Sequence, residues 1–160
     1  MAENSNGTTN GAAAALPQLA VNAQYLKDFS FESPNAPQSL VPNQGQPQIA
    51  VNVDVQAKGL APDMFEVAIR LNADAKIADK PAFLVELVYA GLFTLKNIPA
   101  DALEQVCLIE CPRLLFPFAR RIVADATRDG GFPPLMLDPI DFAELYRRSK
   151  APAEAAAATV

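Results

Sequence analysis

The sequence predicts an α+β fold, in which a four-stranded antiparallel sheet is followed by one long and one shorter helix. Three observations predict it. Segments before residue 96 alternate apolar and polar residues with a period of two, as half-buried strands do. Segments after residue 100 repeat apolar residues every three or four positions, as helices do. Mostly short turns separate the strand segments, and all strands precede the helices, which favours an antiparallel sheet over alternating βαβ units.

The composition is that of a chain with one hydrophobic core. It has 160 residues, 51% of them hydrophobic, and a net charge of −5, which argues against nucleic acid or an anionic membrane as a partner. No run of roughly 18 apolar residues and no signal sequence is present, so we expect a cytoplasmic protein. Histidine is absent, which removes the commonest general base and zinc ligand and lowers the expectation of an enzyme.

Both ends of the chain consist mostly of small and polar residues and are rich in alanine. Residues 1–20 and 150–160 are therefore predicted to be disordered tails. Between them lies one domain, residues 21–149.

The first strand is expected within residues 21–32. Its alternation would place Phe29 and Phe31 on one face and Asp28, Ser30 and Glu32 on the other. Residues 33–47 then hold four prolines and one glycine, which predicts an extended connection without regular structure. Loops of this length are usually functional or flexible.

Three more strands are expected within residues 48–56, 64–77 and 82–95. The first two alternate clearly, with Ile49, Val51, Val53 and Val55 on one face of the former, and Phe65, Val67, Ile69 and Leu71 on one face of the latter. The last strand is nearly all apolar: Phe83, Val85, Leu87 and Tyr89 share one face, and Leu84, Glu86 and Val88 the other.

A long helix is predicted from residue 101 to residue 128. Pro112 and Pro117 lie inside it, and each should bend or divide it because proline lacks a backbone donor. The sequence "RDGGFPP" should end it with a glycine cap followed by proline.

A shorter helix is predicted over residues 138–149. Asp138 is the expected N-cap, with Pro139 as the first helical residue. Arg147 and Arg148 would then lie near its C-terminus and complement the helix dipole.

Asp28 and Glu32 are the first candidate site. On one strand they lie about 13 Å apart at ~3.3 Å per residue. That is too far for the roughly 5–9.5 Å that a glycosidase carboxylate pair needs. The remaining interpretations are a solvated face or an acidic docking stripe.

Glu86 is the one charged residue within "PAFLVELVYAGLF". A buried, unpaired carboxylate would be costly, so its face is expected to be exposed. Leu84 and Val88 would be exposed with it, as on a protein-binding sheet face, although ordinary solvation of an edge remains an alternative. Cys107 and Cys111 share one helix face but have no further metal ligands near them, so we expect them to be buried structural residues.

The long helix carries more apolar surface than one sheet face can cover. Its large apolar residues, Leu114, Leu115, Phe116 and Phe118, run almost all round it. We therefore expect a homo-oligomer with this helix at the interface.

Several stretches, in this order, resemble the SecB family of bacterial protein-export chaperones. They are "FSFESPNAP", "AFLVELVYAGLF" and "ECPRLLFPFARRIVADATRDGGFPPLMLDPIDFAELYRR", and the resemblance covers about residues 22–149. It implies a homotetramer, a dimer of dimers with long helices packed between sheets. It further implies an ATP-independent chaperone that keeps preproteins unfolded and delivers them to the SecA motor, with no catalysis, no cofactor and no metal of its own.

The resemblance also implies roles for individual residues. By position, the SecA-binding residues are Asp28, Glu32, Leu84 and Glu86, which would receive the zinc-binding, basic C-terminal tail of SecA. The client groove would lie between residues 33–47 and 138–149, lined by Leu40, Val51, Val53, Phe83 and Phe132. The oligomer interface would include Val85, Leu87, Tyr89, Leu114 and Phe118. One departure is that the connection reads "LVPNQGQP", without the aromatic residue that family members often carry there.

Two alternatives to an export chaperone stay open at this point. A SecB-like holdase for another client, such as a toxin–antitoxin system, would be expected to lose the SecA-binding set, which is intact here. A histidine-free enzyme would need a closed polar pocket with converging carboxylates, whereas an exposed sheet face would argue against it.

Overall fold

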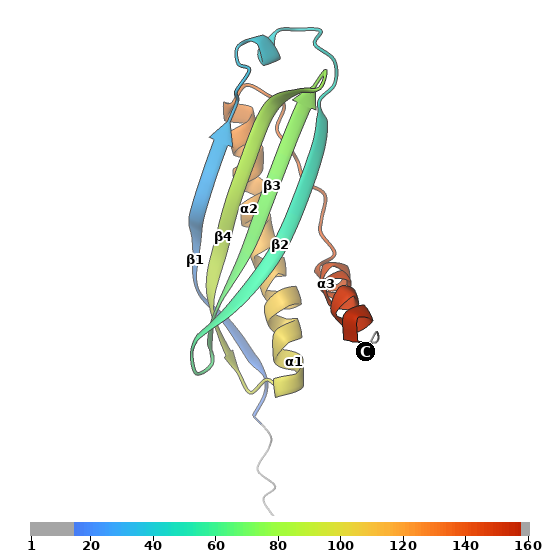
Figure 1. Ribbon diagram of the computed structural model, residues 1–160. Coiled ribbons are helices and arrows are strands. Elements are labelled where there is room, and N and C mark those ends of the chain that lie inside the picture. The colour runs from blue at the N-terminus through green and yellow to red at the C-terminus, as the bar shows by residue number, and fades with distance from the viewer. Residues whose placement is uncertain (1–14, 158–160) are drawn as a thin grey trace, which may run out of the picture.

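A four-stranded antiparallel sheet carries helix α2 along one of its faces (Figure 1). The computed structural model describes residues 15–157, with side chains to residue 151. The strands are β1 (Gln18–Glu32), β2 (Gln48–Ala61), β3 (Met64–Ile77) and β4 (Lys80–Lys96), in the spatial order β1-β4-β3-β2. The predicted α+β class is confirmed. Among the described residues, no helix is long and apolar enough to cross a membrane.

The connections follow from the turn chemistry and the strand order. Tight turns join β2, β3 and β4, with positive φ angles of 62° at Asp63, 49° at Ala78 and 62° at Asp79. Strand β1 pairs with β4, so β1 and β2 lie at opposite edges of the sheet. The crossover loop, residues 33–47, therefore passes over the end of the sheet and spans three strand spacings of about 4.8 Å each (Figure 1).

Hydrogen bonds from the crossover loop fasten its first residues to the start of β4. Ser33 donates to the Ala82 carbonyl at 3.2 Å, and the Asn35 amide donates to the Pro81 carbonyl at 2.7 Å. The loop also contains the short 3-10 helix η1 (Gln38–Leu40).

The hydrophobic core lies between α2 and the inner face of the sheet, the face that α2 covers. The apolar residues that alternate on β3 and β4 are buried there: Val67, Ile69, Leu71, Phe83, Val85 and Leu87. From α2 they meet Leu115, Ala119 and Val123. A side chain at Gly91 would lie 2.8 Å from Leu115 Cδ2, so glycine lets α2 approach β4 closely.

The predicted long helix is divided. It consists of α1 (Ala100–Gln105), the π-helical turn η2 (Val106–Glu110) and α2 (Cys111–Asp129). The π turn ends just before Pro112, which has no N–H to continue the helical hydrogen bonds, whereas α2 runs through Pro117. The glycine end is as expected, since Gly131 follows the helix with a φ of +88°.

Helix α3 (Phe142–Ala157) begins later and ends later than predicted. Asp141 caps it, because its Oδ1 accepts the backbone N–H of Glu144 at 3.0 Å. The predicted cap at Asp138 with Pro139 was wrong, since both lie in an extended segment before the helix. Arg147 and Arg148 are not at the helix end and pair with Glu144 instead.

The predicted tail boundaries also change. Strand β1 starts at Gln18, inside the expected N-terminal tail, and α3 continues into the expected C-terminal tail. The expected disorder of residues 1–14 falls outside the described residues.

Replacing the cap of α3 should loosen that helix. We expect Asp141→Ala to remove the N-cap bond and to cost about 1 kcal/mol locally, or roughly fivefold faster amide exchange in the first turns of α3. Hydrogen exchange of the α3 amides measures this. Asp138→Ala is the matched control, and a larger effect of this control than of Asp141→Ala would contradict the assignment.

Candidate functional site

The outer face of the sheet, opposite α2, brings together the four residues predicted to bind SecA. Across β1 and β4, Glu32 lies opposite Leu84, Ser30 opposite Glu86, and Asp28 opposite Val88. Opposed residues of paired strands share a face, so these side chains form one continuous surface. Asp28, Glu32 and Glu86 are exposed and Leu84 is half-buried, as expected for a solvent-facing sheet surface.

A further carboxylate, Asp74, belongs to the same surface. Asp74 of β3 is exposed and lies opposite Leu84. Leu84 therefore has Glu32 on one side and Asp74 on the other. Asp74 was missed by the sequence analysis. Alternation places Asp74 on the polar face of β3, but only the strand order shows that it lies next to Leu84 of β4. We call the set Asp28, Glu32, Asp74, Leu84 and Glu86 the acidic face.

The charge of the acidic face is strongly unbalanced. In the three rows that run across β1, β4 and β3 here, four carboxylates accompany a single cation, Arg70, which lies opposite Val88. Such a surface attracts basic peptides and presents an apolar contact at Leu84 in its middle. The carboxylates point to solvent instead of converging in a closed pocket, which argues against the enzyme alternative.

Beside the acidic face, three side chains form a network across the sheet. Lys27 of β1 pairs with Glu66 Oε1 of β3 at 2.7 Å, and the Tyr25 hydroxyl donates to Glu66 Oε2. The hydrogen bond from Lys27, and then that from Tyr25, lowers the pKa of Glu66. Burial, and then the bond to Glu66, raises the pKa of Tyr25 to about 12. At neutral pH Glu66 is therefore a carboxylate and Tyr25 a neutral phenol.

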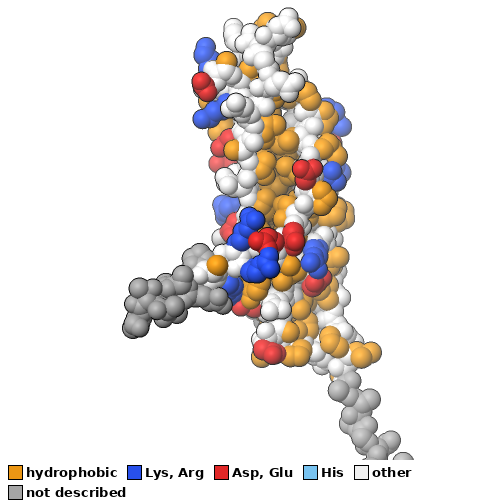
Figure 2. Space-filling model, turned by 90° about the vertical axis from the view of Figure 1, so that its right-hand side faces the viewer, with side chains coloured by type: hydrophobic (Ala, Val, Ile, Leu, Met, Phe, Trp, Pro, Cys, Tyr) orange, Lys and Arg blue, Asp and Glu red, His pale blue; other side chains and the backbone are white. Residues whose placement is uncertain are grey.

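An apolar groove follows the inner side of edge strand β2. A hollow of about 420 Å³ lies between Val51 and Val53, both predicted client residues, and the segment before α3. Its lining is Ile49, Val51, Val53, Leu135, Met136, Leu137, Asp138, Pro139 and Ile140. A separate hollow of about 590 Å³ lies further along β2, from Val55 to Gly59, against α1 and the π turn. Leu145 and Tyr146 of α3 lie near Asp54 and Val55, between the two hollows. Figure 2 shows this side of the molecule, with hydrophobic side chains along its length and charged ones around α3.

The structure does not place the remaining predicted client residues along this groove. Phe83 and Phe132 are only 2% and 8% exposed, and their ring centroids lie 5.0 Å apart. Phe31 stacks on Phe83 at 6.0 Å, so the three rings form a closed aromatic cluster. Leu40 is exposed and lies over Gly131, next to this cluster. The expectation that the two phenylalanines line an open groove is therefore corrected.

Thr127 anchors the wall of the groove to α2. It is fully buried; its Oγ1 accepts the backbone N–H of Leu135 at 2.8 Å and donates to the Val123 carbonyl at 3.0 Å. Its own carbonyl accepts the N–H of Phe132 at 3.0 Å. This residue thus sets the path of the segment that faces β2.

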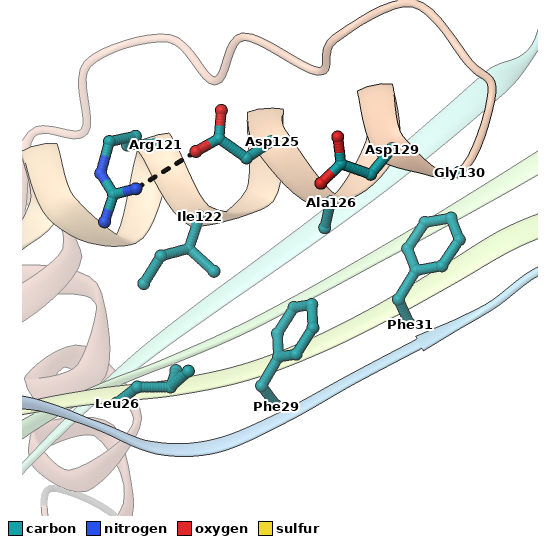
Figure 3. A pocket seen from close by; sticks show the side chains of 9 residues that line it. All are labelled: Leu26, Phe29, Phe31, Arg121, Ile122, Asp125, Ala126, Asp129 and Gly130. Atoms are coloured by element: carbon teal, nitrogen blue, oxygen red, sulfur yellow. Dashed lines mark hydrogen bonds and ion pairs between the residues drawn. The ribbon is translucent and has the colours of Figure 1, made fainter.

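A second apolar surface lies on the other side of the molecule, between α2 and β1. A hollow of about 430 Å³ there is lined by Leu26, Phe29 and Phe31 of β1 and by Arg121, Ile122, Asp125, Ala126, Asp129 and Gly130 (Figure 3). Nearby on α2, Leu114 and Phe118 are 44% and 43% exposed.

The predicted interface residues divide into two groups. Leu114 and Phe118 are available to a partner chain. Val85, Leu87 and Tyr89 are not, because α2 of the same chain covers them, and the Tyr89 ring stacks on Phe118 at 6.2 Å. Their prediction as interface residues was wrong.

The two cysteines are buried, as expected for structural residues. Burial raises the pKa of the Cys111 thiol to about 12, and burial likewise raises the pKa of Cys107. Both therefore stay protonated at neutral pH. Within residues 15–157, no group of three or more His, Cys, Asp and Glu is placed to hold a metal ion.

Comparison with known proteins decides the family. The family model described as preprotein translocase subunit SecB matches residues 12–153. The chain belongs to the SecB family. A Parvibaculum lavamentivorans protein named Protein-export protein SecB is 60% identical, over 95% of this chain and 90% of its own length. A Maricaulis maris protein of the same name is 54% identical, over 98% of this chain and 91% of its own length.

A solved SecB-like structure has the same fold. It is a Mycobacterium tuberculosis SecB-like chaperone in complex with a peptide from an antitoxin. The TM-score is 0.64 at 19% identity, over 76% of this chain and 90% of that one. The resemblance inferred from the sequence motifs is thus confirmed for the SecB family and its fold.

Removing the Thr127 hydroxyl should destabilise the groove wall. Thr127→Val keeps the shape but leaves the Leu135 N–H without its acceptor, so we expect a loss of about 1–3 kcal/mol in unfolding free energy. Urea unfolding measures it. Thr127→Ser keeps the hydroxyl and is the control; equal losses for the two variants would assign the effect to packing and not to the hydrogen bond.

Proposed function

We propose that this SecB protein is a cytoplasmic, ATP-independent chaperone that holds non-native preproteins and passes them to SecA for export, without catalysing a reaction itself. The observation that carries the proposal is the similarity to Protein-export protein SecB sequences at 60% and 54% identity over nearly the whole chain. The toxin–antitoxin alternative has no comparable support, since the SecB-like chaperone bound to an antitoxin peptide is similar in fold at only 19% identity.

SecA would dock on the acidic face. Its C-terminal tail is basic, and four exposed carboxylates against one guanidinium give the face a complementary charge. Charge-assisted hydrogen bonds to Glu32, Asp74 and Glu86 would surround an apolar contact with Leu84. The zinc ion of that tail belongs to SecA, so the chaperone needs no metal ligands.

Clients would bind along the β2 groove. A non-native chain offers apolar side chains and unpaired backbone groups, and edge strand β2 has both apolar residues facing the groove and an unpaired backbone edge. From Ile49 to Gly59 the two hollows of the groove together follow about 33 Å of strand, at roughly 3.3 Å per residue. Recognition of this kind does not read a particular sequence, which suits a chaperone of many preproteins.

The chain would assemble as a homotetramer through α2 and β1. Leu114 and Phe118 are large apolar side chains left half-exposed on α2, and the hollow of Figure 3 continues this apolar surface to Leu26 and Phe29. A second copy of the chain is the partner that buries such a surface in a homo-oligomer.

Charge reversal on the acidic face should weaken SecA binding. We expect Glu86→Lys and Asp28→Arg each to lower the affinity for SecA about 5- to 30-fold at low salt, and less at high salt, because the attraction is Coulombic. Titration calorimetry with purified SecA at two salt concentrations measures this. Asp101→Lys, an exposed carboxylate at the start of α1, is the matched control.

A client-binding assay distinguishes a role of Asp28 and Glu86 in docking from a role in folding or assembly. Both acidic-face variants should delay the refolding of a reduced preprotein as well as the wild type does. If client binding and SecA binding fall together, these residues act in folding or assembly and the docking proposal fails.

A charge on the exposed α2 surface should dissociate the tetramer. We expect the wild type to have a mass of about 68 kDa in solution, four times the 17.1 kDa of one chain. Leu114→Glu and Phe118→Glu should shift it to dimers or monomers, since a buried unpaired carboxylate costs several kcal/mol. Light scattering measures the mass. Leu60→Glu, equally exposed near the β2–β3 turn, should stay tetrameric, and unchanged masses for all variants would contradict the interface.

A further inference from the structure

Strand β1 contains a β-bulge at Lys27, next to the acidic face. Tyr25 lies opposite Ala90, Leu26 opposite Tyr89, and Asp28 opposite Val88. Lys27 therefore has no partner residue of its own on β4 and is the extra residue of the bulge.

The bulge decides which face carries the carboxylates of β1. Before it, Tyr25 points to the outer face, and Leu26 points inward with Tyr89. In a regular strand, side chains alternate, so Asp28 would also point inward. The extra residue shifts the alternation by one, which turns Asp28 and Glu32 outward and leaves Phe31 inward against Phe83.

The network described above holds the bulge at two points of β1. Lys27 is the extra residue itself, and Tyr25 lies two residues before it. Both reach over β4 to the same carboxylate, Glu66 of β3, through a 2.7 Å ion pair and a hydrogen bond. Glu66 is shielded, with 17% of its side chain exposed against 50% for Lys27, so its position is well defined.

We propose that Tyr25, Lys27 and Glu66 are positioning residues for the acidic face: they fix the bulge at Lys27 and so hold Asp28 and Glu32 on the outer face beside Glu86. The expected effect on SecA binding rests on the proposed docking of SecA. The expected effect on the position of the bulge does not.

A purely electrostatic role and a positioning role of Lys27 predict opposite changes in the affinity for SecA when Lys27 is replaced by Met. Lys27→Met removes a cation from beside the acidic face, so charge alone would tighten the binding of a basic tail. Positioning predicts weaker binding, because the bulge can move along β1 and turn Asp28 inward. Adding Tyr25→Phe removes the second hold on the bulge without changing the charge.

The first test is titration of purified SecA with the full-length double variant Tyr25→Phe/Lys27→Met. We expect at least fivefold weaker binding than for the wild type, while Lys27→Arg keeps the ion pair and binds normally. Lys58→Met is the matched charge control: Lys58 lies opposite Glu66 on β2 and is remote from the bulge, so its loss should not weaken binding. Binding of the double variant as tight as that of Lys58→Met would overturn the proposal.

The second test reads the geometry without SecA. Single cysteines are introduced as Asp28→Cys or Phe29→Cys, and their reaction rates with a polar maleimide are compared; the parent chain, with its two buried cysteines, gives the background. We expect position 28 to react faster than position 29 in the wild-type background, and the ratio to approach or pass below one in the double variant. An unchanged ratio would overturn the proposal.

The two tests separate the ways in which the inference can fail. If the wild-type protein does not bind SecA but the labelling ratio changes as expected, the proposed function fails and the geometric role of the network stands. If SecA binding weakens at an unchanged ratio, the network acts by another route and the inference is wrong. Circular dichroism and client binding control for folding, and Lys27→Met alone replaces the double variant if the latter is unfolded.

Discussion

The fold depends on a sheet that is covered on one face only. Helix α2 buries the inner residues of β3 and β4, so their inner positions must be apolar, whereas their outward positions are free to be polar or charged. That freedom allows the acidic face. It also explains Glu86, which stands alone in an apolar strand yet points away from the core.

The position of β1 accounts for the other surfaces. By pairing with β4 and not with β2, it leaves β2 as an edge whose inner side faces the segment before α3, and it forces the crossover loop over the end of the sheet. The same placement sets Leu26 and Phe29 beside α2, where they remain only partly covered. A single pairing choice thus produces the groove, the loop and the apolar surface offered to a second chain.

Alternation and turn residues were enough to predict the strands, and the cost of burying an unpaired carboxylate was enough to predict the outward direction of Glu86, because both are local properties. The start of α3 was not predictable in this way, since Asp138 with Pro139 and Asp141 are both acceptable caps. Packing decides between them, as Phe142 must reach Phe116, with ring centres 5.9 Å apart. Asp74 beside Leu84, and the covering of Val85 by α2, depend on strand order and helix placement, which no single strand encodes.

The acidic face and the β2 groove lie on opposite sides of a sheet one layer thick and share no residue. Ligands on the two surfaces would therefore not exclude each other sterically, so a ternary complex of chaperone, client and docking partner would form. In such a complex, transfer of the client would not come from steric displacement by the docked partner. It would be a kinetic partition, set by how fast a client segment leaves the groove compared with how fast the motor captures it.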